Sequence, residues 1–179
     1  YWAAPQIKLL SEQGVIVGYP DGTFKPDANV TRAEFAAMAI RALGQQHTKE
    51  AQPVHFSDIT EDYWAYQDIQ KALYFDLISC DKKGELFRPE DSVSRAESLS
   101  VAVNALTTEQ ISPAKAKEVL SRKYADANSI PEWFIIPAGK AEILGMVVVA
   151  PSAKKAELEA SRPATRAEVA AILYNMMEQ

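Results

Sequence analysis

A four-residue pattern occurs three times in this 179-residue chain, and each copy of it follows a tryptophan at nearly the same distance. The pattern is Ser or Thr, then Arg, Ala and Glu, and its arginines are 63 and 71 residues apart. All three tryptophans of the chain stand 30, 31 or 33 residues before such an arginine. The chain is therefore predicted to contain three copies of one structural unit. The patterns are Thr31–Glu34, Ser94–Glu97 and Thr165–Glu168, and the tryptophans are Trp2, Trp64 and Trp133.

Other positions follow the same register. Twelve residues after each tryptophan stands a residue suited to a turn, and a large apolar residue occupies one slot of the loop that follows. Two of the three units also carry a Phe-Ser-Asp or Tyr-Ala-Asp motif before the tryptophan, and we expect the first unit to be truncated at its start because it has no counterpart. The turn positions are Gly14, Asp76 and Gly145; the loop positions are Phe24, Phe87 and Leu158; the motifs are 56–58 and 124–126.

Each unit is predicted to fold as a helix, a loop and a second helix. Apolar residues recur at i, i+4 and i+7 after each tryptophan, which is the spacing of one helix face, and a second such face follows each four-residue pattern. One helix pair cannot bury its apolar face alone. We therefore expect an all-α fold, a pseudo-threefold bundle of three helix–loop–helix repeats with at most minor β structure in the loops. The first faces are Ala3, Ile7 and Leu10; Ala65, Ile69 and Ala72; and Phe134, Ala138 and Ala141.

The register also divides the chain into domains. Polar connectors separate the repeats, and the second connector is predicted to be partly helical because Ser112 can cap a helix and Pro113 suits its first turn. The predicted parts are repeat 1 at 1–46, repeat 2 at 54–107, the partly helical connector at 108–123 and repeat 3 at 124–179.

Composition and spacing exclude several function classes. A net charge of −5 lacks the basic surface typical of nucleic-acid binding, and the longest apolar stretch, 143–150, is far shorter than the ~20 residues of a membrane helix. The loop around Asp21 lacks the ligand spacing of a calcium hand, and His47 and His55 are interpreted as solvated. The recurring carboxylates are explained as helix caps and no nucleophile motif is present, so no enzymatic activity, metal or cofactor is expected.

The four-residue pattern has the form of a capping box, in which the hydroxyl accepts from the third helical amide and the Glu accepts from the cap's own amide. This explains the Ser or Thr and the Glu, but not the arginines Arg32, Arg95 and Arg166. Each arginine falls at the first helical position, where the helix dipole disfavours a cation. Two explanations remain open: the guanidinium and free helix amides bind an anion, or each arginine pairs with an acidic residue of the neighbouring repeat.

The whole chain resembles three tandem S-layer homology (SLH) domains. The residues that carry the resemblance are Trp2-Ala3, Trp64-Ala65, Phe56-Ser57-Asp58, the run Gly18-Tyr19-Pro20-Asp21-Gly22-Thr23-Phe24, and the three boxes. The loop of repeat 3 departs from this pattern. The resemblance implies a three-pronged spindle that attaches a surface protein to a wall-linked polysaccharide, commonly one bearing pyruvylated amino sugars. It implies localisation in the cell envelope, with the box arginines holding the acidic sugar in grooves between repeats.

The predicted ligand-binding residues combine the boxes with aromatic and turn residues. The tryptophans have two interpretations, as core anchors at helix starts or as groove walls that stack on a sugar. A self-assembly module making protein contacts in a surface layer is the alternative function. We also expect Arg32→Ala to weaken wall binding with little loss of stability, and Glu34→Ala to lower stability. The predicted binding residues are Arg32, Arg95, Arg166, Trp2, Trp64, Trp133, Tyr19, Asp21 and Gly22.

Overall fold

The computed structural model describes residues 1–44, 53–80, 84–106, 110–148 and 156–178. Across these ranges the protein is helical, with backbone pairing between segments limited to isolated β-bridges. The predicted all-α class is confirmed. None of the helices in the described ranges is both long and apolar enough to cross a membrane.

Each repeat contributes two helices joined by a loop, as expected. A further helix, α5 (Pro113–Lys123), precedes repeat 3, and Ser112 caps it by accepting from the amide of Lys115, which confirms the predicted helical connector. Two 3-10 turns, η1 (Ala127–Ser129) and η2 (Glu132–Phe134), follow it. The helix pairs are α1 (Ala4–Glu12) and α2 (Arg32–Ala42), α3 (Tyr66–Tyr74) and α4 (Arg95–Leu106), and α6 (Ile135–Ile143) and α7 (Arg166–Met177).

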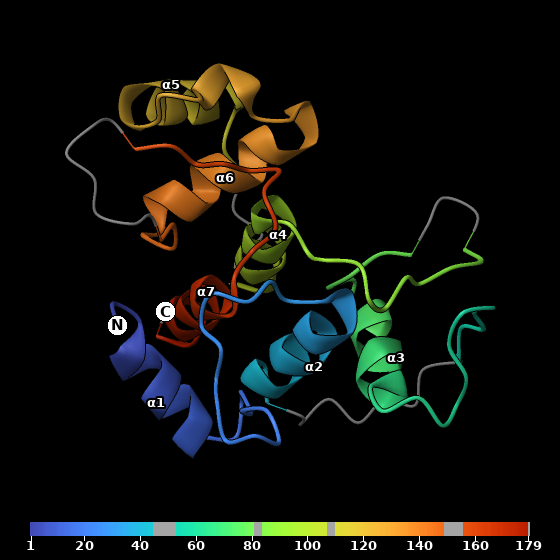
Figure 1. Cartoon of the computed structure of the whole chain (residues 1–179). Helices are drawn as coiled ribbons and strands as arrows, with labels where there is room; N and C mark the ends of the chain where they lie inside the picture. The colour runs from blue at the N-terminus through green and yellow to red at the C-terminus, as the bar shows by residue number, and fades with distance from the viewer. Residues whose placement is uncertain (45–52, 81–83, 107–109, 149–155, 179) are drawn as a thin grey trace.

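The first helix of each repeat packs against the second helix of the repeat before it (Figure 1). Thus α3 lies on α2 and α6 lies on α4, while α1 lies on α7 and so closes the ring between repeats 3 and 1. Helix α7 also contacts α2 and α4, and α5 covers α6. Because of this exchange, each lobe seen in Figure 1 is built from two repeats, and the two ends of the chain meet in one lobe.

Three buried residues join the repeats at the centre of the ring. The amide of Val30 donates to the carbonyl of Ala164 at 3.0 Å, that of Ala164 to Val93 at 2.9 Å, and that of Val93 back to Val30 at 2.9 Å. Each residue stands directly before the cap of a second helix, and all three are buried. This closed circle of backbone hydrogen bonds fixes where α2, α4 and α7 begin.

The predicted apolar faces form the contacts between the helices. In the first helices, Ala3, Leu10, Ala65, Ile69 and Ala72 are fully buried. The same holds for the corresponding positions of α6, where Gly139 also permits close packing: a Cβ there would lie 2.7 Å from the Cβ of Ala116 on α5. Those positions of α6 are Phe134, Ala138 and Ala141.

The three loops share one backbone conformation just after their apolar slot, although their sequences differ. The residue after each loop apolar slot has a positive φ, 51° at Lys25, 58° at Arg88 and 49° at Glu159. Leu158 is fully buried like Phe87, which confirms its assignment to the slot. This shared conformation turns the chain in the same way after the slot residue of each repeat.

Candidate functional site: grooves between the repeats

The box arginine of each repeat reaches into the loop of the next repeat. Arg32 of repeat 1 donates from Nε to the carbonyl of Phe87 at 2.9 Å and from Nη2 to the carbonyl of Ser79. Its Nη1 lies 3.6 Å from the carboxylate of Glu97, the box glutamate of repeat 2. The guanidinium also lies 4.9 Å from the centre of the Phe87 ring. One side chain therefore joins the loop and the helix start of the neighbouring repeat.

The other two arginines repeat this arrangement around the ring. Arg95 donates to the carbonyls of Leu158 and Val148 at 2.8 and 2.9 Å, and to Glu168 of repeat 3 at 2.6 Å. Arg166 closes the circle onto repeat 1. Its contacts are the carbonyl of Phe24 at 2.9 Å, the carbonyl of Val17 at 2.7 Å and the carboxylate of Glu34 at 3.2 Å. Of the two explanations that the sequence left open, the ion pair with the neighbouring repeat is present three times.

The helix amides do not form the anion site that the sequence suggested, and this part of the interpretation is corrected. The amides of Arg32 and Ala33 donate to the carbonyls of Asp91 and Pro89 in the next repeat, and the other two boxes do the same. The third amide donates to the Thr or Ser hydroxyl, as a capping box requires. Since neighbouring backbone occupies the first two amides, the helix starts are internal joints and not open anion sites.

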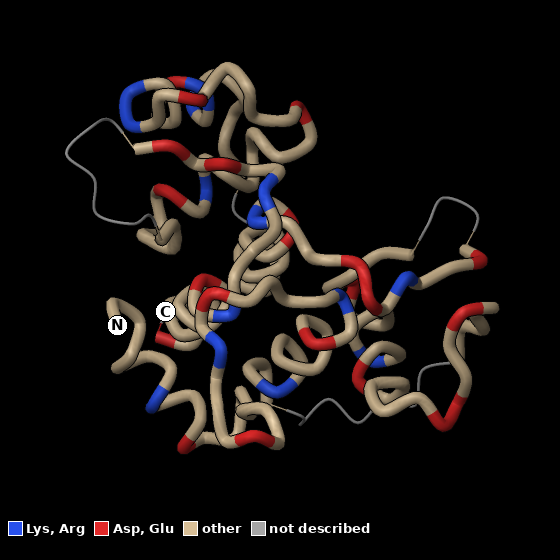
Figure 2. The backbone as a smooth tube through the Cα atoms, in the orientation of Figure 1, with Lys and Arg blue, Asp and Glu red and all other residues tan. Residues whose placement is uncertain are grey.

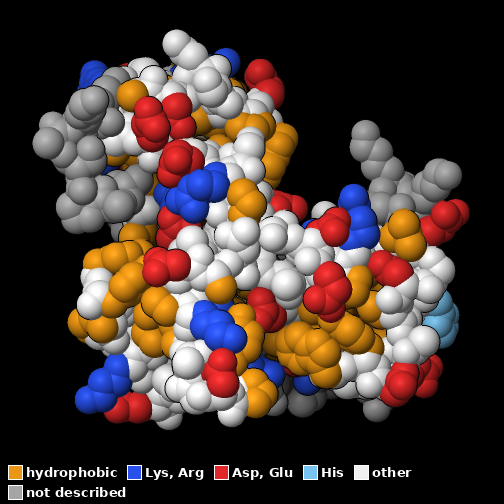
Figure 3. Space-filling model, in the orientation of Figure 1, with side chains coloured by type: hydrophobic (Ala, Val, Ile, Leu, Met, Phe, Trp, Pro, Cys, Tyr) orange, Lys and Arg blue, Asp and Glu red, His pale blue; other side chains and the backbone are white. Residues whose placement is uncertain are grey.

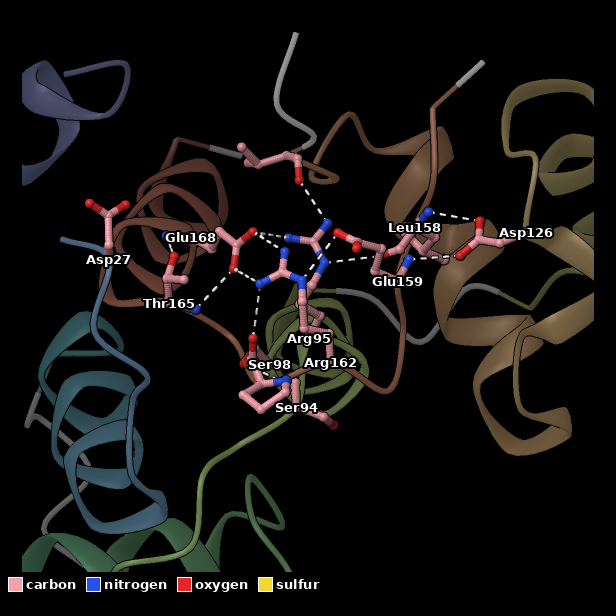
Figure 4. A network of polar contacts seen from close by, with 12 residues as sticks. Asp27, Ser94, Arg95, Ser98, Asp126, Leu158, Glu159, Arg162, Thr165 and Glu168 are labelled. Atoms are coloured by element: carbon pink, nitrogen blue, oxygen red, sulfur yellow. Dashed lines mark hydrogen bonds and ion pairs between the residues drawn. The ribbon is translucent and has the colours of Figure 1, made fainter. Parts of the chain in front are cut away.

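Burial and charge act in opposite directions on the Arg95–Glu168 pair. Burial lowers the pKa of Arg95, whose side chain is only 2% exposed, while the charge of Glu168 opposes that shift. Burial would raise the pKa of Glu168, but hydrogen bonds from Arg162 and the Thr165 amide and the charge of Arg95 outweigh it and hold that pKa below its usual value. Figure 4 shows both guanidinium groups directed at this carboxylate.

In repeats 2 and 3, a further acidic residue holds the loop in place. The carboxylate of Asp58 accepts from the amides of Phe87 and Arg88 at 3.0 and 2.7 Å. Asp126 accepts from the amides of Leu158 and Glu159 at 2.8 Å each (Figure 4). These are the aspartates of the Phe-Ser-Asp and Tyr-Ala-Asp motifs, whose role is therefore to hold the loop against its own repeat.

In the part of the chain that the structure describes, two grooves open beside these joints. The first groove, of about 170 Å³, lies at the loop of repeat 1, and the second groove, of about 230 Å³, lies at the loop of repeat 2. Each has a box arginine and a box glutamate at its base and a tryptophan of the following repeat in its wall. The first groove includes Tyr19, Glu34, Ala37, Arg41, Trp64 and Arg166; the second includes Arg32, Asp76, Glu97, Ser100, Asn104 and Trp133.

The tryptophans lie outside the core, so their interpretation as core anchors is wrong. Trp64 and Trp133 are 59% and 58% exposed, and Trp2 is 42% exposed. The residue after each tryptophan begins the buried helix face, which turns the indole outward at the helix start. Trp64 and Trp133 each line one of the two grooves, whereas Trp2 lines neither of them. Figure 3 shows hydrophobic side chains exposed over the α2 and α3 lobe, with acidic side chains around them.

The three predicted residues of the first loop have different places. Tyr19 lines the first groove and donates from its hydroxyl to Glu34 at 3.2 Å, with its ring 4.6 Å from the guanidinium of Arg166. Asp21 lies in the turn, where hydrogen bonds from the hydroxyl and amide of Thr23 lower its pKa to about 2. Gly22 supplies a φ of 80° there. Asp21 and Gly22 therefore shape the loop and do not line either groove.

Repeat 3 has an additional arginine at its joint. Arg162 donates from both terminal nitrogens to Glu168, at 2.6 and 3.3 Å, so this glutamate receives two guanidinium groups. The corresponding positions of repeats 1 and 2 are Ala28 and Asp91. The joint between Arg95 and Glu168 is consequently the most tightly bound of the three.

Sequence reasoning missed three groove residues on the second helices, namely Arg41, Ser100 and Asn104. In the repeat register, Ala37 corresponds to Ser100 and Arg41 corresponds to Asn104, five and nine residues after the box arginine. The signal that could have found them is a polar residue on an otherwise apolar helix, present in one repeat and changed in the next. The Oγ of Ser100 is buried and has no hydrogen-bond partner among the described residues.

Among the described residues, the acidic, histidine and cysteine side chains are not grouped as metal ligands. In the ranges that the structure describes, no group of three or more His, Cys, Asp and Glu side chains is placed to hold a metal ion. His47 lies outside the described residues, and His55 is exposed. Figure 2 shows basic and acidic positions interspersed along the described part of the backbone. The geometry is that of a ring of three helical repeats with grooves between neighbouring repeats.

The sequence comparisons agree with this class. The sequence model of the S-layer homology domain matches residues 1–36 and 55–97, and these two segments belong to that family. The third unit lies beyond those two segments and is related to them by its box, its loop conformation after the apolar slot and its place in the ring.

Several relatives carry a similar segment within a much longer chain. The exoglucanase XynX of Acetivibrio thermocellus is 33% identical over 178 residues, which cover 99% of this chain and 16% of the exoglucanase. A cellulosome-anchoring protein of the same species is 38% identical over 109 residues, covering 59% of this chain and 24% of the relative. The S-layer protein EA1 of Bacillus anthracis is 32% identical over 105 residues, covering 59% of this chain and 12% of that protein. The chain thus spans at most about a quarter of these relatives, and their catalytic names do not transfer to it.

Proposed function

We propose that this chain anchors a larger protein to the bacterial cell envelope by binding an acidic, wall-linked polysaccharide that carries pyruvylated amino sugars. The observation that carries the proposal is the construction of the two grooves, each with an arginine at its base and an exposed tryptophan in its wall. An indole face stacks on a sugar ring, and a guanidinium group pairs with a carboxylate. The chain is a module of the cell-envelope surface, in keeping with relatives named as S-layer and cellulosome-anchoring proteins.

Two of the box arginines, Arg32 and Arg166, have a double role in this proposal, whereas Arg95 lines neither groove. Their burial and their carbonyl contacts build the groove, while the guanidinium edge that remains at the groove surface meets the sugar. Arg166 lines the first groove and Arg32 the second, and the ion pair of Arg32 with Glu97, at 3.6 Å, is the longest of the three box pairs. Two grooves on one rigid body raise the avidity for a polymer by roughly 10²–10⁴ where both engage at once.

The proposal is tested by co-sedimentation with purified wall sacculi, before and after chemical removal of the polysaccharide. The chain is expected to bind the intact sacculi and to lose binding once the polysaccharide is removed. A Trp64→Ala, Trp133→Ala double variant should bind at least tenfold more weakly and remain folded, because both side chains are exposed. Tyr74→Ala, which removes an exposed aromatic residue that lines neither groove, is the matched control. Undiminished binding to stripped sacculi would favour protein contacts in a surface lattice instead.

A further inference from the structure

The two grooves have the same position in their repeats but opposite charge. We propose, on the basis of the proposed function, that they recognise different units of one polymer: the first groove binds its acidic unit, and the second groove binds an uncharged, hydroxyl-rich unit. The residues that decide this are Arg41 in the first groove and Asp76, Ser100 and Asn104 in the second.

The first groove has a surplus of positive charge. Arg166 and Arg41 line it together with a single carboxylate, that of Glu34. This carboxylate is already occupied, because it accepts from the Thr31 amide at 2.9 Å, the Tyr19 hydroxyl at 3.2 Å and Arg166 at 3.2 Å. A carboxylate on a ligand would therefore meet the two cations Arg41 and Arg166. The one carboxylate of the groove, that of Glu34, already accepts hydrogen bonds within the protein.

Arg41 remains available to a ligand. Its nearest acidic partner is Asp68 on α3, at 3.7 Å, which is longer than a hydrogen-bonded ion pair. Its side chain is partly exposed at the groove surface, nine positions after the box arginine. Its ion pair with Asp68 is longer than the 3.2 Å pair of Arg166 with Glu34, and its side chain is 29% exposed compared with 5% for Arg166, so Arg41 is the cation of this groove that a ligand can reach more easily.

The second groove has a surplus of negative charge. Arg32 faces two carboxylates, those of Glu97 and Asp76. The side chain of Glu97 is 42% exposed, compared with 20% for Glu34, and Asp76 is exposed. Carboxylates accept hydrogen bonds from sugar hydroxyls but repel an anionic ligand.

The floor of the second groove also offers polar groups that the first lacks. The hydroxyl of Ser100 is buried without a partner in the described structure, and the amide of Asn104 is exposed next to it in the groove lining. A buried, unpaired hydroxyl costs stability unless a bound ligand satisfies it. In the first groove the same positions are Ala37 and Arg41, and the counterpart of Asp76 is Gly14. The two grooves therefore differ in charge and polarity because of three equivalent pairs of residues: Gly14 and Asp76, Ala37 and Ser100, and Arg41 and Asn104.

Each groove contains one tryptophan, so indole N–H resonances in ¹H–¹⁵N spectra report on the two grooves separately. The signals are assigned with Trp64→Phe and Trp133→Phe. The probes are the methyl glycoside of an N-acetylated amino sugar carrying a pyruvate ketal, and the same glycoside without the ketal. We expect the pyruvylated probe to shift Trp64 with at least tenfold higher affinity than the plain glycoside, and the plain glycoside to be the tighter ligand at Trp133.

Exchanging the deciding residues tests the assignment directly. Arg41→Asn should weaken the acidic probe at Trp64 about tenfold and leave Trp133 unaffected. Ser100→Ala should weaken the plain glycoside at Trp133 about fivefold, since one hydrogen bond is lost. The double change Asp76→Gly, Asn104→Arg should give the second groove a preference for the acidic probe. Arg122→Asn, at an exposed position on α5, is the matched control for loss of a positive charge.

Two outcomes separate this inference from the proposed function. If the pyruvylated probe binds both grooves with equal affinity, the inference is overturned while wall anchoring stands. If neither probe shifts any indole signal and sacculi are not bound either, the proposed function fails together with it.

Discussion

Arg95 and Glu168 belong to different repeats, yet their side chains meet at 2.6 Å in the interior of the protein. The guanidinium of Arg95 is 2% exposed and also donates to two carbonyls of the same neighbouring loop. Its removal takes one of two guanidinium partners from the carboxylate of Glu168 and leaves the two carbonyls without this donor. Such a loss lowers the free energy of unfolding by about 3–5 kcal/mol.

Arg95→Ala is therefore expected to lower the unfolding temperature by about 10 °C, as measured by circular dichroism. Arg122→Ala removes an arginine whose side chain is 75% exposed and should change the free energy of unfolding by less than about 0.5 kcal/mol. The same reasoning corrects the expectation that Arg32→Ala leaves stability nearly unchanged, because Arg32 is also buried and spans two repeats. Equal melting of Arg95→Ala and the parent protein would contradict a structural role for these arginines.

Acid should weaken the contact of Glu168 with Arg95 and Arg162, because it protonates the carboxylate of Glu168. Arg162, the Thr165 amide and Arg95 outweigh the effect of burial and lower the pKa of Glu168 from its ordinary value of 4.5. A carboxylate with a lowered folded-state pKa contributes stability above its ordinary pKa, and that contribution is lost as the pH falls through the folded value. Glu168→Gln should thus be destabilising at pH 7 and much less so at pH 2.5, in urea denaturation at both pH values. A constant difference between variant and parent would mean that protonation of Glu168 does not govern this loss.

Asp58 is expected to hold the loop of repeat 2 in place. Its carboxylate accepts from two successive amides, those of Phe87 and Arg88, and bonds to a charged acceptor are worth more than neutral ones. Asp58→Ala should cost about 1–3 kcal/mol and speed hydrogen exchange at these two amides. Asp91→Ala, which breaks a surface pair 3.8 Å long, serves as the comparison and should leave their exchange unchanged.

Asp76 carries a backbone strain that its counterparts avoid. Its φ is 53°, while Gly14 and Gly145 hold 71° and 67° at the same position of the other repeats. Asp76→Gly is expected to raise stability by about 0.5–1 kcal/mol, because glycine adopts this conformation freely. Gly145→Ala should have the opposite sign although a Cβ there meets nothing within 4 Å, so only the backbone conformation is tested. Calorimetry on both variants checks whether Asp76→Gly raises the unfolding temperature and Gly145→Ala lowers it.

The exchange of helices makes the three repeats depend on one another. A fragment of residues 1–106 retains α1 to α4 but lacks α7, on which α1 packs, and α6, which covers α4. It is expected to lose cooperative unfolding and the near-ultraviolet signal of packed tyrosine and phenylalanine side chains. Sharp cooperative unfolding of this fragment would indicate that the first two repeats form a domain by themselves.

The sequence predicted the helices and the threefold repetition because these depend on local spacing. The i, i+4 and i+7 faces such as Ala65, Ile69 and Ala72 are buried as expected, and both Thr-based capping boxes form. It did not predict which helices pack together, since the exchange between α1 and α7 joins opposite ends of the chain. Repetition alone does not reveal such a partner.

The site was predicted only in outline for the same reason. The mismatch of arginine with the helix dipole correctly marked Arg32, Arg95 and Arg166 as residues with a special role. Whether such an arginine meets a ligand or a neighbouring glutamate depends on the distance between repeats, which spacing along one repeat does not contain. Arg41 and Asn104 were missed because a single polar residue on a helix has many ordinary explanations.

The placement of the box residues also explains why some parts of the repeats differ while others are alike. Each box glutamate caps its own helix and receives the arginine of the repeat before it, so a change at one box disturbs two repeats at once. A loop tip such as Asp21 and Gly22 makes its turn within its own repeat and can vary alone. The box residues that join the repeats are therefore constrained to remain the same in all three repeats. The loop tips are not constrained in this way, so each can change and give its own groove a separate ligand preference.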